Sequence, residues 1–406
     1  MRQNIKKSYI VVIYKMYLDP LRSQKLGIYS NMIKKHTPFS YKDIILHQKS
    51  CKYGSRDYFH IQREINGDLV SNVTFIIDLL DTENLVDDIE LALIKNIELI
   101  GGGSQLEKIK NDSLYQYHHL NNKIAKREGN KFIITIPFFI NKTKGYFGNY
   151  LPLVALQYHD ISLSIVFESL QNLTKHQKET NGNKEFNVCV FARYISLDEK
   201  ERKTLIHNPR NEYLIMQNFT RKENIYNIHY DNLKKLNTLR SVFDFETIEK
   251  IGKYITGKHV SLNENNISTT IELKIALNFN HPVKSMNISI RSPSNDVYFN
   301  YKSVIKHLEL KLDRTIHTNE KGLYLSTVAQ NKYKSKNNNI YSILFSNNPN
   351  EIQPSGSINF SRVDQALLSM EIDTKELDKE EKLIVTCENY NILRVMSGML
   401  GLAYQS

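Results

Sequence analysis

Apolar and polar side chains alternate with a period of two along several stretches of the sequence. In 69–79 one face of the chain is apolar, with Leu69, Val73, Phe75, Ile77 and Leu79, and the other is polar, with Asn72, Thr74 and Asp78. The same alternation recurs in 161–167, 186–194 and 271–279. This pattern is typical of strands that bury one face. It predicts a mostly β protein whose antiparallel strands form sandwiches.

Helical signals are few and short. Residues 197–206 begin with acidic and end with basic side chains, which suits the helix dipole, and Asn208 with Pro209 predicts the end of this helix. A further helix is predicted at 323–330. Residues 227–256 fit either a helix or an irregular connection, and their periodicity does not separate the two.

The predicted strands fall into two parts of similar length, divided near residue 217. Each part has about 190 residues, which is room for eight strands of about 6 residues plus loops, the size of a jelly roll. We therefore expect an N-terminal arm at 1–29, a first jelly roll at 30–217 and a second at 218–406. The fold class expected is all-β, with short helices in the loops.

Composition narrows the function classes without choosing one. The 406 residues are 41% hydrophobic and 24% charged, which excludes a disordered or fibrous chain. A net charge of +11 permits contact with nucleic acid, anionic lipid or an acidic partner. We interpret the densest basic cluster, 332–336, as a solvated loop. Three scattered cysteines indicate a reducing compartment, and no stretch approaches the roughly 20 apolar residues of a membrane span.

Few residues suggest chemistry. His159 beside Asp160 is an acid–base pair on paper, but neighbouring side chains on a strand point to opposite faces, so we do not expect them to share a site. His118 and His119 have no third ligand at a usual metal-site spacing. Residues 101–103, three glycines, lack the Lys-Ser/Thr of a phosphate loop and are interpreted as a turn. The sequence predicts no catalytic residue, no cofactor and no metal.

Seven blocks stand in an order that identifies a family. In the first part they are 33–40 (IKKHTPFS), 135–139 (TIPFF), 151–160 (LPLVALQYHD) and the junction at 197–215. In the second part they are 278–284 (NFNHPVK), 353–364 (QPSGSINFSRVD) and 389–399 (NYNILRVMSGM). In this order they resemble the double jelly-roll major capsid proteins of nucleocytoplasmic large DNA viruses.

The motif residues that carry this resemblance are interpreted as structural. They are His36, Thr37, Phe39, Gln157, Tyr158, His159, Asn208, Pro209, Asn280, His281, Pro282, Gln353, Pro354, Ser355, Gly356, Asn359, Phe360, Ser361, Arg362, Asp364, Asn391, Arg394, Ser397 and Gly398. A Pro-Ser-Gly turn at 354–356 is expected to lead into a strand. Arg362 is expected to pair with Asp364 or a distant carboxylate, and His281 with Pro282 to end a strand.

The resemblance implies a double jelly roll with a structural, non-enzymatic role. It implies a homotrimer with a pseudo-hexameric outline that contacts neighbouring capsomers and minor capsid proteins in an icosahedral shell. The protein would belong to the virion after assembly in the host cytoplasm, with its N-terminal arm near the internal membrane or minor proteins. Neither a cofactor nor a specific nucleic acid is implied. Residues 1–32 lack the usual family features and the chain is short, so a minor capsid or scaffold paralogue is the alternative.

A different class stays open on the residues alone. Jelly rolls also host lectins and glycosidases, so a carbohydrate-binding β-sandwich protein is a further candidate. A glycosidase needs paired carboxylates across a cleft and a lectin usually presents exposed aromatic residues, neither of which one sequence reveals. A basic nucleic-acid binder is the weakest of these hypotheses, because the lysines are dispersed.

Overall fold

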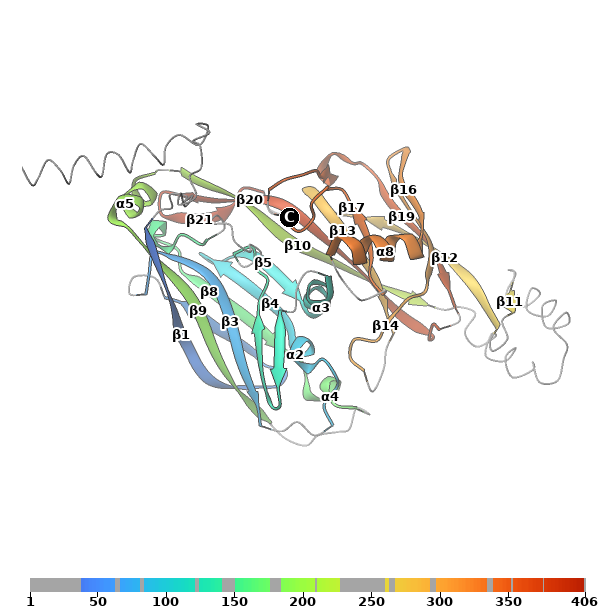
Figure 1. The fold of residues 1–406 in the computed structure, drawn as a ribbon, viewed down its shortest axis with the longest axis horizontal. Helices are drawn as coiled ribbons and strands as arrows, with labels where there is room; N and C mark the ends of the chain where they lie inside the picture. The colour runs from blue at the N-terminus through green and yellow to red at the C-terminus, as the bar shows by residue number, and fades with distance from the viewer. Residues whose placement is uncertain are drawn as a thin grey trace, which may run out of the picture.

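A computed structural model shows an elongated molecule made almost entirely of β-strands (Figure 1). It describes residues 38–62, 66–80, 84–120, 124–140, 150–175, 184–208, 210–226, 260–262, 267–292, 297–333, 339–351, 353–374 and 376–404. The predicted arm at 1–29, the motif residues His36, Thr37 and Pro209, and the stretch at 227–256 lie outside these ranges. Every strand pair in the described chain is antiparallel.

The first half, residues 38–208, consists of two packed sheets. One has the strand order β1-β9-β3-β7-β6 and the other β2-β8-β4-β5. The strands are β1 (Phe39–Lys52), β2 (Arg56–Ile61), β3 (Leu69–Leu79), β4 (Ile94–Gly101), β5 (Ser104–Lys110), β6 (Ala125–Glu128), β7 (Lys131–Thr135), β8 (Ile161–Phe167) and β9 (Glu185–Leu197). The helices are α2 (Ile89–Ala92), α3 (Asn111–Leu120), α4 (Leu170–Leu173), α5 (Glu199–His207) and the 3₁₀ turn η1 (Leu153–Ala155).

The second half, residues 210–404, repeats this architecture. One sheet has the order β10-β20-β13, with β14, β17 and β18 along the free edge of β13 and β21 beside β20; the other has the order β11-β12-β19-β15-β16. The strands are β10 (Arg210–Tyr226), β11 (Val260–Leu262), β12 (Ile267–Leu277), β13 (Pro282–Arg291), β14 (Tyr301–Lys302), β15 (Ile305–Leu312), β16 (Thr315–Lys321), β17 (Tyr341–Leu344), β18 (Ile358–Asn359), β19 (Ala366–Asp373), β20 (Glu380–Met396) and β21 (Met399–Leu402). The helix α8 (Gly322–Tyr333) and the 3₁₀ turn η3 (Phe360–Arg362) complete it.

The two halves share one strand order. In the first half β1, β9, β3 and β7 form one sheet, and β2, β8, β4 and β5 form the other. In the second half β10, β20, β13 and β17 correspond to the first set, and β12, β19, β15 and β16 to the second. This is the jelly-roll arrangement of eight strands in two sheets. The expected pair of antiparallel jelly rolls is confirmed, and each half adds short strands to its eight.

Three of the four strands predicted from alternation keep their limits closely, and the fourth is shifted. The predictions at 69–79, 161–167 and 186–194 correspond to β3, β8 and β9. The prediction at 271–279 corresponds to β12, which ends at Leu277. Phe279 is nevertheless buried, because its ring packs against that of Phe360 in the connection to β13. Because this loop residue is apolar and buried, it fitted the alternation and extended the predicted strand past its true end.

Both short helices predicted from the sequence are present as α5 and α8. However, α8 extends to Tyr333 and therefore includes Lys332, which we expected in a solvated loop. The reason is that Tyr333 is buried, in a small cluster with Leu120 at the end of α3 and Ile340. This contact fixes the last turn of α8, so the interpretation of this part of the lysine-rich cluster was wrong.

The strand β10 bears on the division between the halves. It runs from Arg210 to Tyr226, across the expected boundary at residue 217, and pairs along its whole length with β20. Because β20 belongs to the second half, strand pairing assigns all of β10 to that half as well. We propose α5 and the residues after it as the junction between the two jelly rolls.

The sheet β10-β20-β13 is covered on both faces. One face forms the second core, to which β20 contributes Leu383 and Val385. Ile384, on the opposite face of the same strand, belongs to the core of the first half, as does Leu393 nearer the end of the strand. Figure 1 shows β10 and β20 running from the top of the first half into the second. A strand covered on both faces reads as an apolar run instead of an alternation, and this strand joins the two cores.

A glycine at the start of α8 provides a test of this packing. A Cβ atom at Gly322 would lie 1.9 Å from the carbonyl oxygen of Ile305, a backbone atom of β15. We expect Gly322→Ala to lower the free energy of unfolding by about 3 kcal/mol, at the upper end of overpacking effects. The control is Gly401→Ala in β21, where a Cβ would have no neighbour within 4 Å. Urea denaturation measures both, and equal midpoints would contradict the packing.

Candidate functional site

A buried ionic cluster joins the two halves at the start of α3. The side chain of Asp112 is fully buried and pairs with Arg291 of β13, with 2.8 Å between Oδ1 and Nη1, and also with Lys222 of β10. The hydroxyl of Tyr301 on β14 donates a hydrogen bond of 2.7 Å to the same carboxylate. One carboxylate of the first half therefore binds side chains from three strands of the second.

Electrostatics keeps this cluster charged. Burial alone would raise the pKa of Asp112, but the charges of Arg291 and Lys222 outweigh burial and hold that pKa below its ordinary value. Burial raises the pKa of Tyr301 well above its ordinary value, so its hydroxyl keeps the proton that it donates. The buried carboxylate is thus paired with two cations, of which Lys222 remains partly exposed, and the cluster leaves no free acid or base.

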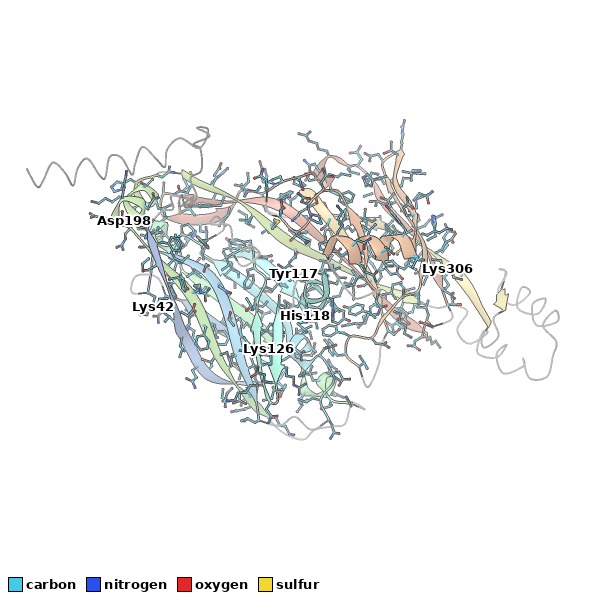
Figure 2. The ribbon with its side chains drawn as sticks, viewed as in Figure 1. Lys42, Tyr117, His118, Lys126, Asp198 and Lys306 are labelled. Atoms are coloured by element: carbon cyan, nitrogen blue, oxygen red, sulfur yellow. The ribbon has the colours of Figure 1, made fainter. Side chains whose placement is uncertain are left out.

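Neutral hydrogen bonds extend the contact between the halves. Along α3, the Gln116 amide donates to the Ser289 hydroxyl of β13 at 2.8 Å, and Ser113 shares a hydrogen bond with Thr220 of β10. The Gln217 amide of β10 donates to the carbonyl oxygen of Leu106 in β5. Figure 2 shows α3, with Tyr117 and His118 labelled, between the two halves. The contact between the halves is therefore polar along α3.

A second polar chain runs from α3 to the loop after β8. The Asn111 amide donates to the Tyr298 hydroxyl at 2.6 Å, and that hydroxyl donates to Glu168 at 3.1 Å. Burial raises the pKa of Tyr298, so the hydroxyl remains a donor. Lys95 lies 3.6 Å from the Glu168 carboxylate and adds a charge at the rim. These contacts fasten the loop between β13 and β14 to the first half.

The Gln157-Tyr158-His159 motif binds the other end of the interface. The backbone N–H groups of Gln157 and Tyr158 donate to the carbonyl oxygen of Gly398, at 2.9 and 3.1 Å. Nδ1 of His159 accepts the N–H of Leu400 at 3.0 Å. The block is an irregular loop and not the strand we assumed, so the argument from opposite strand faces does not apply. The imidazole is instead engaged with the backbone of β21.

Two glycines make room for this motif. A Cβ atom at Gly102, in the hairpin turn between β4 and β5, would lie 2.2 Å from Nδ1 of His159, and one at Gly398 would lie 2.6 Å from Cβ of Gln157. Both glycines have positive φ, 56° and 77°. The interpretation of residues 101–103 as a turn is confirmed, and Gly102 also accommodates the imidazole.

The motifs at 278–284 and 353–364 come together in the second half. The backbone N–H of His281 donates to Ser361 Oγ at 2.9 Å, and the N–H of Phe360 donates to the His281 carbonyl at 3.1 Å. Pro282 pairs with Asn359 where β13 meets β18. His281 therefore precedes β13 and Pro282 begins it, so this pair does not end a strand, which corrects our prediction. Burial lowers the pKa of His281, which favours its neutral form.

The turn before β18 has the predicted character, but the predicted ion pair does not form. Gly356 has φ of 140°, and a Cβ there would lie 2.5 Å from the carbonyl oxygen of Phe345, so only glycine fits. The strand that follows is short, and Phe360 begins a 3₁₀ turn. Arg362 and Asp364 are exposed and make no ion pair with each other. The neighbouring motif residues Gln353, Pro354 and Ser355 lie in this same loop, where the Ser355 carbonyl accepts the N–H of Asn347.

The remaining motif residues hold strand ends. The Asn391 amide donates to Gln217 and to the carbonyl of Tyr404, both at 2.8 Å, and Arg394 pairs with Glu212 of β10 at 2.8 Å. Ser397 and Gly398, both at positive φ, form the turn from β20 to β21. Asn280 accepts the Asn389 amide through its carbonyl, Asn208 follows α5 as predicted, and Phe39 begins β1 opposite Leu197.

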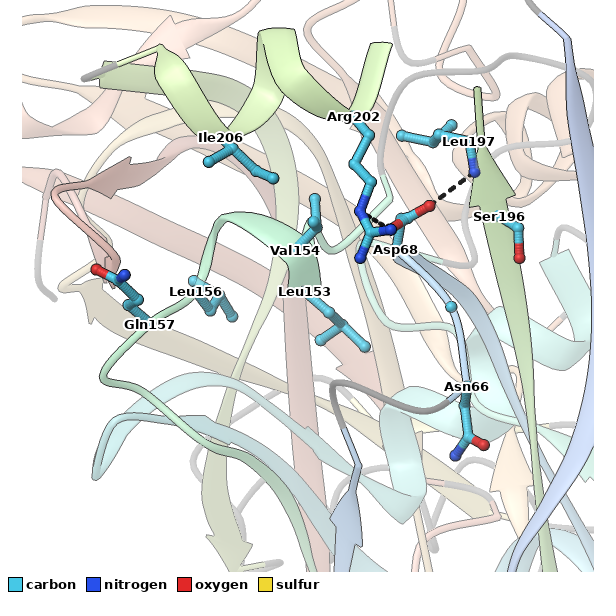
Figure 3. A pocket seen from close by; sticks show the side chains of 11 residues that line it. Asn66, Asp68, Leu153, Val154, Leu156, Gln157, Ser196, Leu197, Arg202 and Ile206 are labelled. Atoms are coloured by element: carbon cyan, nitrogen blue, oxygen red, sulfur yellow. Dashed lines mark hydrogen bonds and ion pairs between the residues drawn. The ribbon is translucent and has the colours of Figure 1, made fainter. Parts of the chain in front are cut away.

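A cleft lies between η1 and α5 (Figure 3). Its volume is about 520 Å³, and its lining includes Gln157, Leu153 and Ile206. Asp68 on its wall pairs with Arg202 of α5 at 3.0 Å and accepts the N–H of Leu197 at 2.8 Å. Its one carboxylate is thus already engaged in fastening α5 to the end of β9.

Sequence reasoning did not find the charged residues that form ion pairs with buried partners. Asp112, Arg291 and Lys222 belong to none of the seven blocks, and Lys284 was counted only as part of one. Lys284 is buried, lies 3.3 Å from Glu388 and donates to the carbonyl oxygen of Glu351. The available signal was a charged residue within a strand that is otherwise buried on both faces, since such a charge requires a partner.

Within the described ranges, no three His, Cys, Asp or Glu side chains gather as a metal site would require. The helices in those ranges include none of the length and apolar character that a bilayer span needs.

The two halves match two family profiles. "Major capsid protein N-terminus" matches residues 27–198, and "Large eukaryotic DNA virus major capsid protein" matches residues 201–401. The chain belongs to this capsid protein family. The two profiles meet at the start of α5, close to the junction proposed above, and the family expected from the sequence blocks is confirmed.

Individual relatives agree over nearly the whole chain. The major capsid protein of Pyramimonas orientalis virus is 26% identical over 94% of both chains, and that of Paramecium bursaria Chlorella virus 1 is 25% identical over 94% of both. Among solved structures, the PBCV-1 virus capsid gives a TM-score of 0.73 at 22% identity, covering 94% of this chain and 100% of that one. The Faustovirus major capsid protein gives 0.64 at 8% identity, covering 96% and 97%. These structural likenesses show the double jelly-roll fold.

Replacing the central carboxylate should cost more stability than replacing a carboxylate in an exposed ion pair. Asp112→Asn leaves Arg291 and Lys222 without a counter-charge, so we expect a loss of about 3–5 kcal/mol in the free energy of unfolding. The matched control is Asp43→Asn, which breaks an exposed ion pair with Arg193 and should cost less than about 1 kcal/mol. Urea denaturation at neutral pH measures both, and equal losses would contradict the role of the cluster.

The same variant should alter the pH dependence of stability. Because the folded-state pKa of Asp112 is lowered, its contribution is present above the unfolded value of about 3.9 and is lost as pH falls from there through the folded-state pKa. The difference between the wild type and Asp112→Asn should be constant above about pH 5 and shrink below about pH 4. A difference that grows on acidification would reverse this assignment.

The His159 contact gives a smaller effect. His159→Gln displaces the acceptor for the Leu400 N–H at a half-buried position, so we expect a loss of about 1 kcal/mol. His207→Gln on the exposed side of α5 is the control and should leave the unfolding midpoint unchanged. Thermal unfolding of both variants tests this, and a hydrolase activity abolished by His159→Gln would overturn the structural interpretation.

Proposed function

We propose that this protein is a structural subunit of a viral capsid, which self-associates into homotrimers that tile an icosahedral shell. The observation that carries the proposal is the repeat itself: two jelly rolls of one strand order, fixed side by side by a buried polar interface. Three such chains around a threefold axis present six similar units. A trimer therefore has a pseudo-hexameric outline, which is a shape suited to tiling a surface.

The polar residues of the candidate site support a structural role. Asp112, His159 and Asp68, which elsewhere serve as acids or bases, each bind a group of the same chain and hold strands or halves together. We infer that the protein acts by its shape and contacts and not by chemistry. The relatives named as major capsid proteins support this reading over a carbohydrate-binding β-sandwich.

A second candidate is a minor capsid or scaffold paralogue. Acanthamoeba polyphaga mimivirus has two proteins similar to this chain, named "Capsid protein 1" and "Probable capsid protein 4", at 35% identity over 95 residues and 26% over 246. One virus therefore carries two different proteins that are similar to parts of this chain. The abundance of the protein in purified particles, measured by mass spectrometry, separates the main coat from a minor component.

Partners and location follow from this role. We propose contacts with neighbouring capsomers and minor capsid proteins, a place in the virion, and assembly in the host cytoplasm. Light scattering of the purified chain tests the first step. A particle mass of about three times 47.4 kDa is expected. The proposal would be contradicted by a protein that is monomeric at micromolar concentration and that forms no shells when it is expressed together with minor capsid proteins.

The N-terminal segment gives a further prediction. Residues 1–29 lack sustained alternation, carry Lys6, Lys7 and Lys15 around the apolar stretch 9–14, and precede the first block of the family. We propose that they lie on the inner side of the shell. Deleting them should leave a soluble trimer whose Tm changes by less than about 2 °C, but electron microscopy should show impaired shell assembly.

A matched variant separates charge from apolar contact in this segment. Lys6→Gln with Lys7→Gln keeps the apolar stretch and removes two charges, so assembly that survives in this variant assigns the role to residues 9–14. If the deletion gives an insoluble or monomeric protein, the segment belongs to the fold or to the trimer contact.

A further inference from the structure

A small cavity lies between α3, α8 and the sheet β10-β20-β13. Its volume is about 20 Å³, and both halves of the chain contribute to its lining, with Gln116 of α3, Tyr333 of α8, Ser285 of β13 and Thr386 of β20 among the residues. Tyr117, which Figure 2 labels between the two halves, belongs to the same lining. The cavity is therefore part of the contact between the two jelly rolls.

Gln116 and Thr386 each bring to this lining a buried polar atom that has no hydrogen-bond partner among the described residues. The atoms are Oε1 of Gln116 and Oγ1 of Thr386. Gln116 is 1% exposed and Thr386 is 6% exposed. The amide nitrogen of Gln116 donates to the Ser289 hydroxyl at 2.8 Å, so this bond leaves the amide oxygen available. Burying a polar atom without a hydrogen bond is costly, and each of these two atoms therefore requires a partner.

The neighbours of Thr386 in the sheet are bonded to other residues. Strand register places Thr386 opposite Thr220 of β10 and opposite Asn287 of β13. Thr220 shares a hydrogen bond with Ser113 of α3, and the side-chain oxygen of Asn287 accepts the Ser342 hydroxyl at 2.6 Å. A partner for the Thr386 hydroxyl must therefore come from the cavity.

The size of the cavity and the charges beside it select the ligand. A water molecule needs about 10–15 Å³ of such space, so the cavity has room for one water and for no larger ligand. The carboxylate of Glu388, which also lines the cavity, lies 3.3 Å from the ammonium group of the buried Lys284. Because this negative charge already has a counter-charge, a metal cation in the cavity would be a buried charge without compensation.

We propose that this cavity binds one water molecule, which donates a hydrogen bond to Oε1 of Gln116 and shares a second one with the hydroxyl of Thr386. A hydroxyl serves as donor or acceptor, so either direction satisfies Thr386. Buried waters make two to four hydrogen bonds, and the hydroxyls of Ser285 and Tyr333 lie in the same lining for the others. The inference goes beyond the proposed function, because it concerns the interior of a single chain.

The water completes the contact between α3 and the sheet. The bonds described above join α3 to β10, through Lys222 and Thr220, and to β13, through Arg291 and Ser289. These two strands flank β20 in the sheet. The water supplies a link from α3 to the central strand β20, at Thr386.

The sign of a stability change tests the proposal. Thr386→Val keeps the shape of the side chain and replaces its hydroxyl with a methyl group. Because the variant removes one partner of the bound water, we expect its Tm to fall by about 2–4 °C. In a dry cavity the same change would replace an unsatisfied hydroxyl with an apolar group, and the Tm would rise. A Tm that rises or stays at the wild-type value overturns the proposal.

The matched control is Thr270→Val in β12. Thr270 is a half-buried strand residue outside the cavity, so this variant measures the general effect of valine in a strand. Its Tm should differ from that of the wild type by less than about 1 °C. Differential scanning calorimetry gives the three values, and a fall of equal size in both variants would contradict a specific role for the Thr386 hydroxyl.

Two measurements on the wild type identify the ligand directly. A crystal or cryo-EM map that resolves ordered water should show a peak about 2.6–3.0 Å from both Oε1 of Gln116 and Oγ1 of Thr386. A map with no peak there, or with a side chain of the same chain in that place, refutes the bound water. The Tm should also be equal in sodium, potassium and choline chloride at one ionic strength. A Tm raised by sodium or potassium alone would assign the cavity to a cation and overturn the proposal.

Discussion

The outer face of β10, β20 and β13 is polar where α3 covers it, and the arrangement of the molecule depends on satisfying it. Arg291 would cost several kcal/mol if it were buried without a counter-charge, and Lys222, which is partly exposed, adds a second positive charge beside it. Asp112 supplies that charge only when α3 lies across the two strands that carry them. An apolar interface would tolerate sliding, whereas this one has a single geometry in which its partners meet. The angle between the two jelly rolls is thereby fixed in each copy.

Strands with one solvent-facing side could be predicted from the sequence, whereas strands buried on both sides could not. In β3, β8 and β9 apolar and polar residues alternate, because one side of each strand is on the whole less buried than the other. β20 carries buried residues on both sides over most of its length, so its pattern has no period of two. The resemblance to known blocks located it instead. The helix α3 gave no signal, because the polar residues of its first turn look like a solvated helix start although they are buried.

The motif residues were predicted as a set from the sequence, and the contacts of those that the structure describes came only from the structure. Gln157, Tyr158 and His159 bind the turn at Gly398, which is more than 200 residues away in sequence. His281 contacts Phe360 and Ser361, and it is separated from Ser361 by 80 residues in sequence. No spacing rule predicts such pairs, because they depend on which loops the strand order brings to one end of a sandwich. Positions of this kind are recognisable as blocks before their partners are known.

The C-terminal strands belong to the second half by pairing and to the first half by packing. Leu393, Val395 and Leu400 are part of the first core, so that core is incomplete until the last residues of the chain have been made. A chain emerging from the ribosome therefore cannot finish its first jelly roll early, although domains are generally free to fold in order of synthesis. Chains that end before β20 would lack the three side chains that this strand and β21 contribute to the first core. The first core therefore depends on strands that belong by pairing to the second jelly roll, which makes the two halves one folding unit.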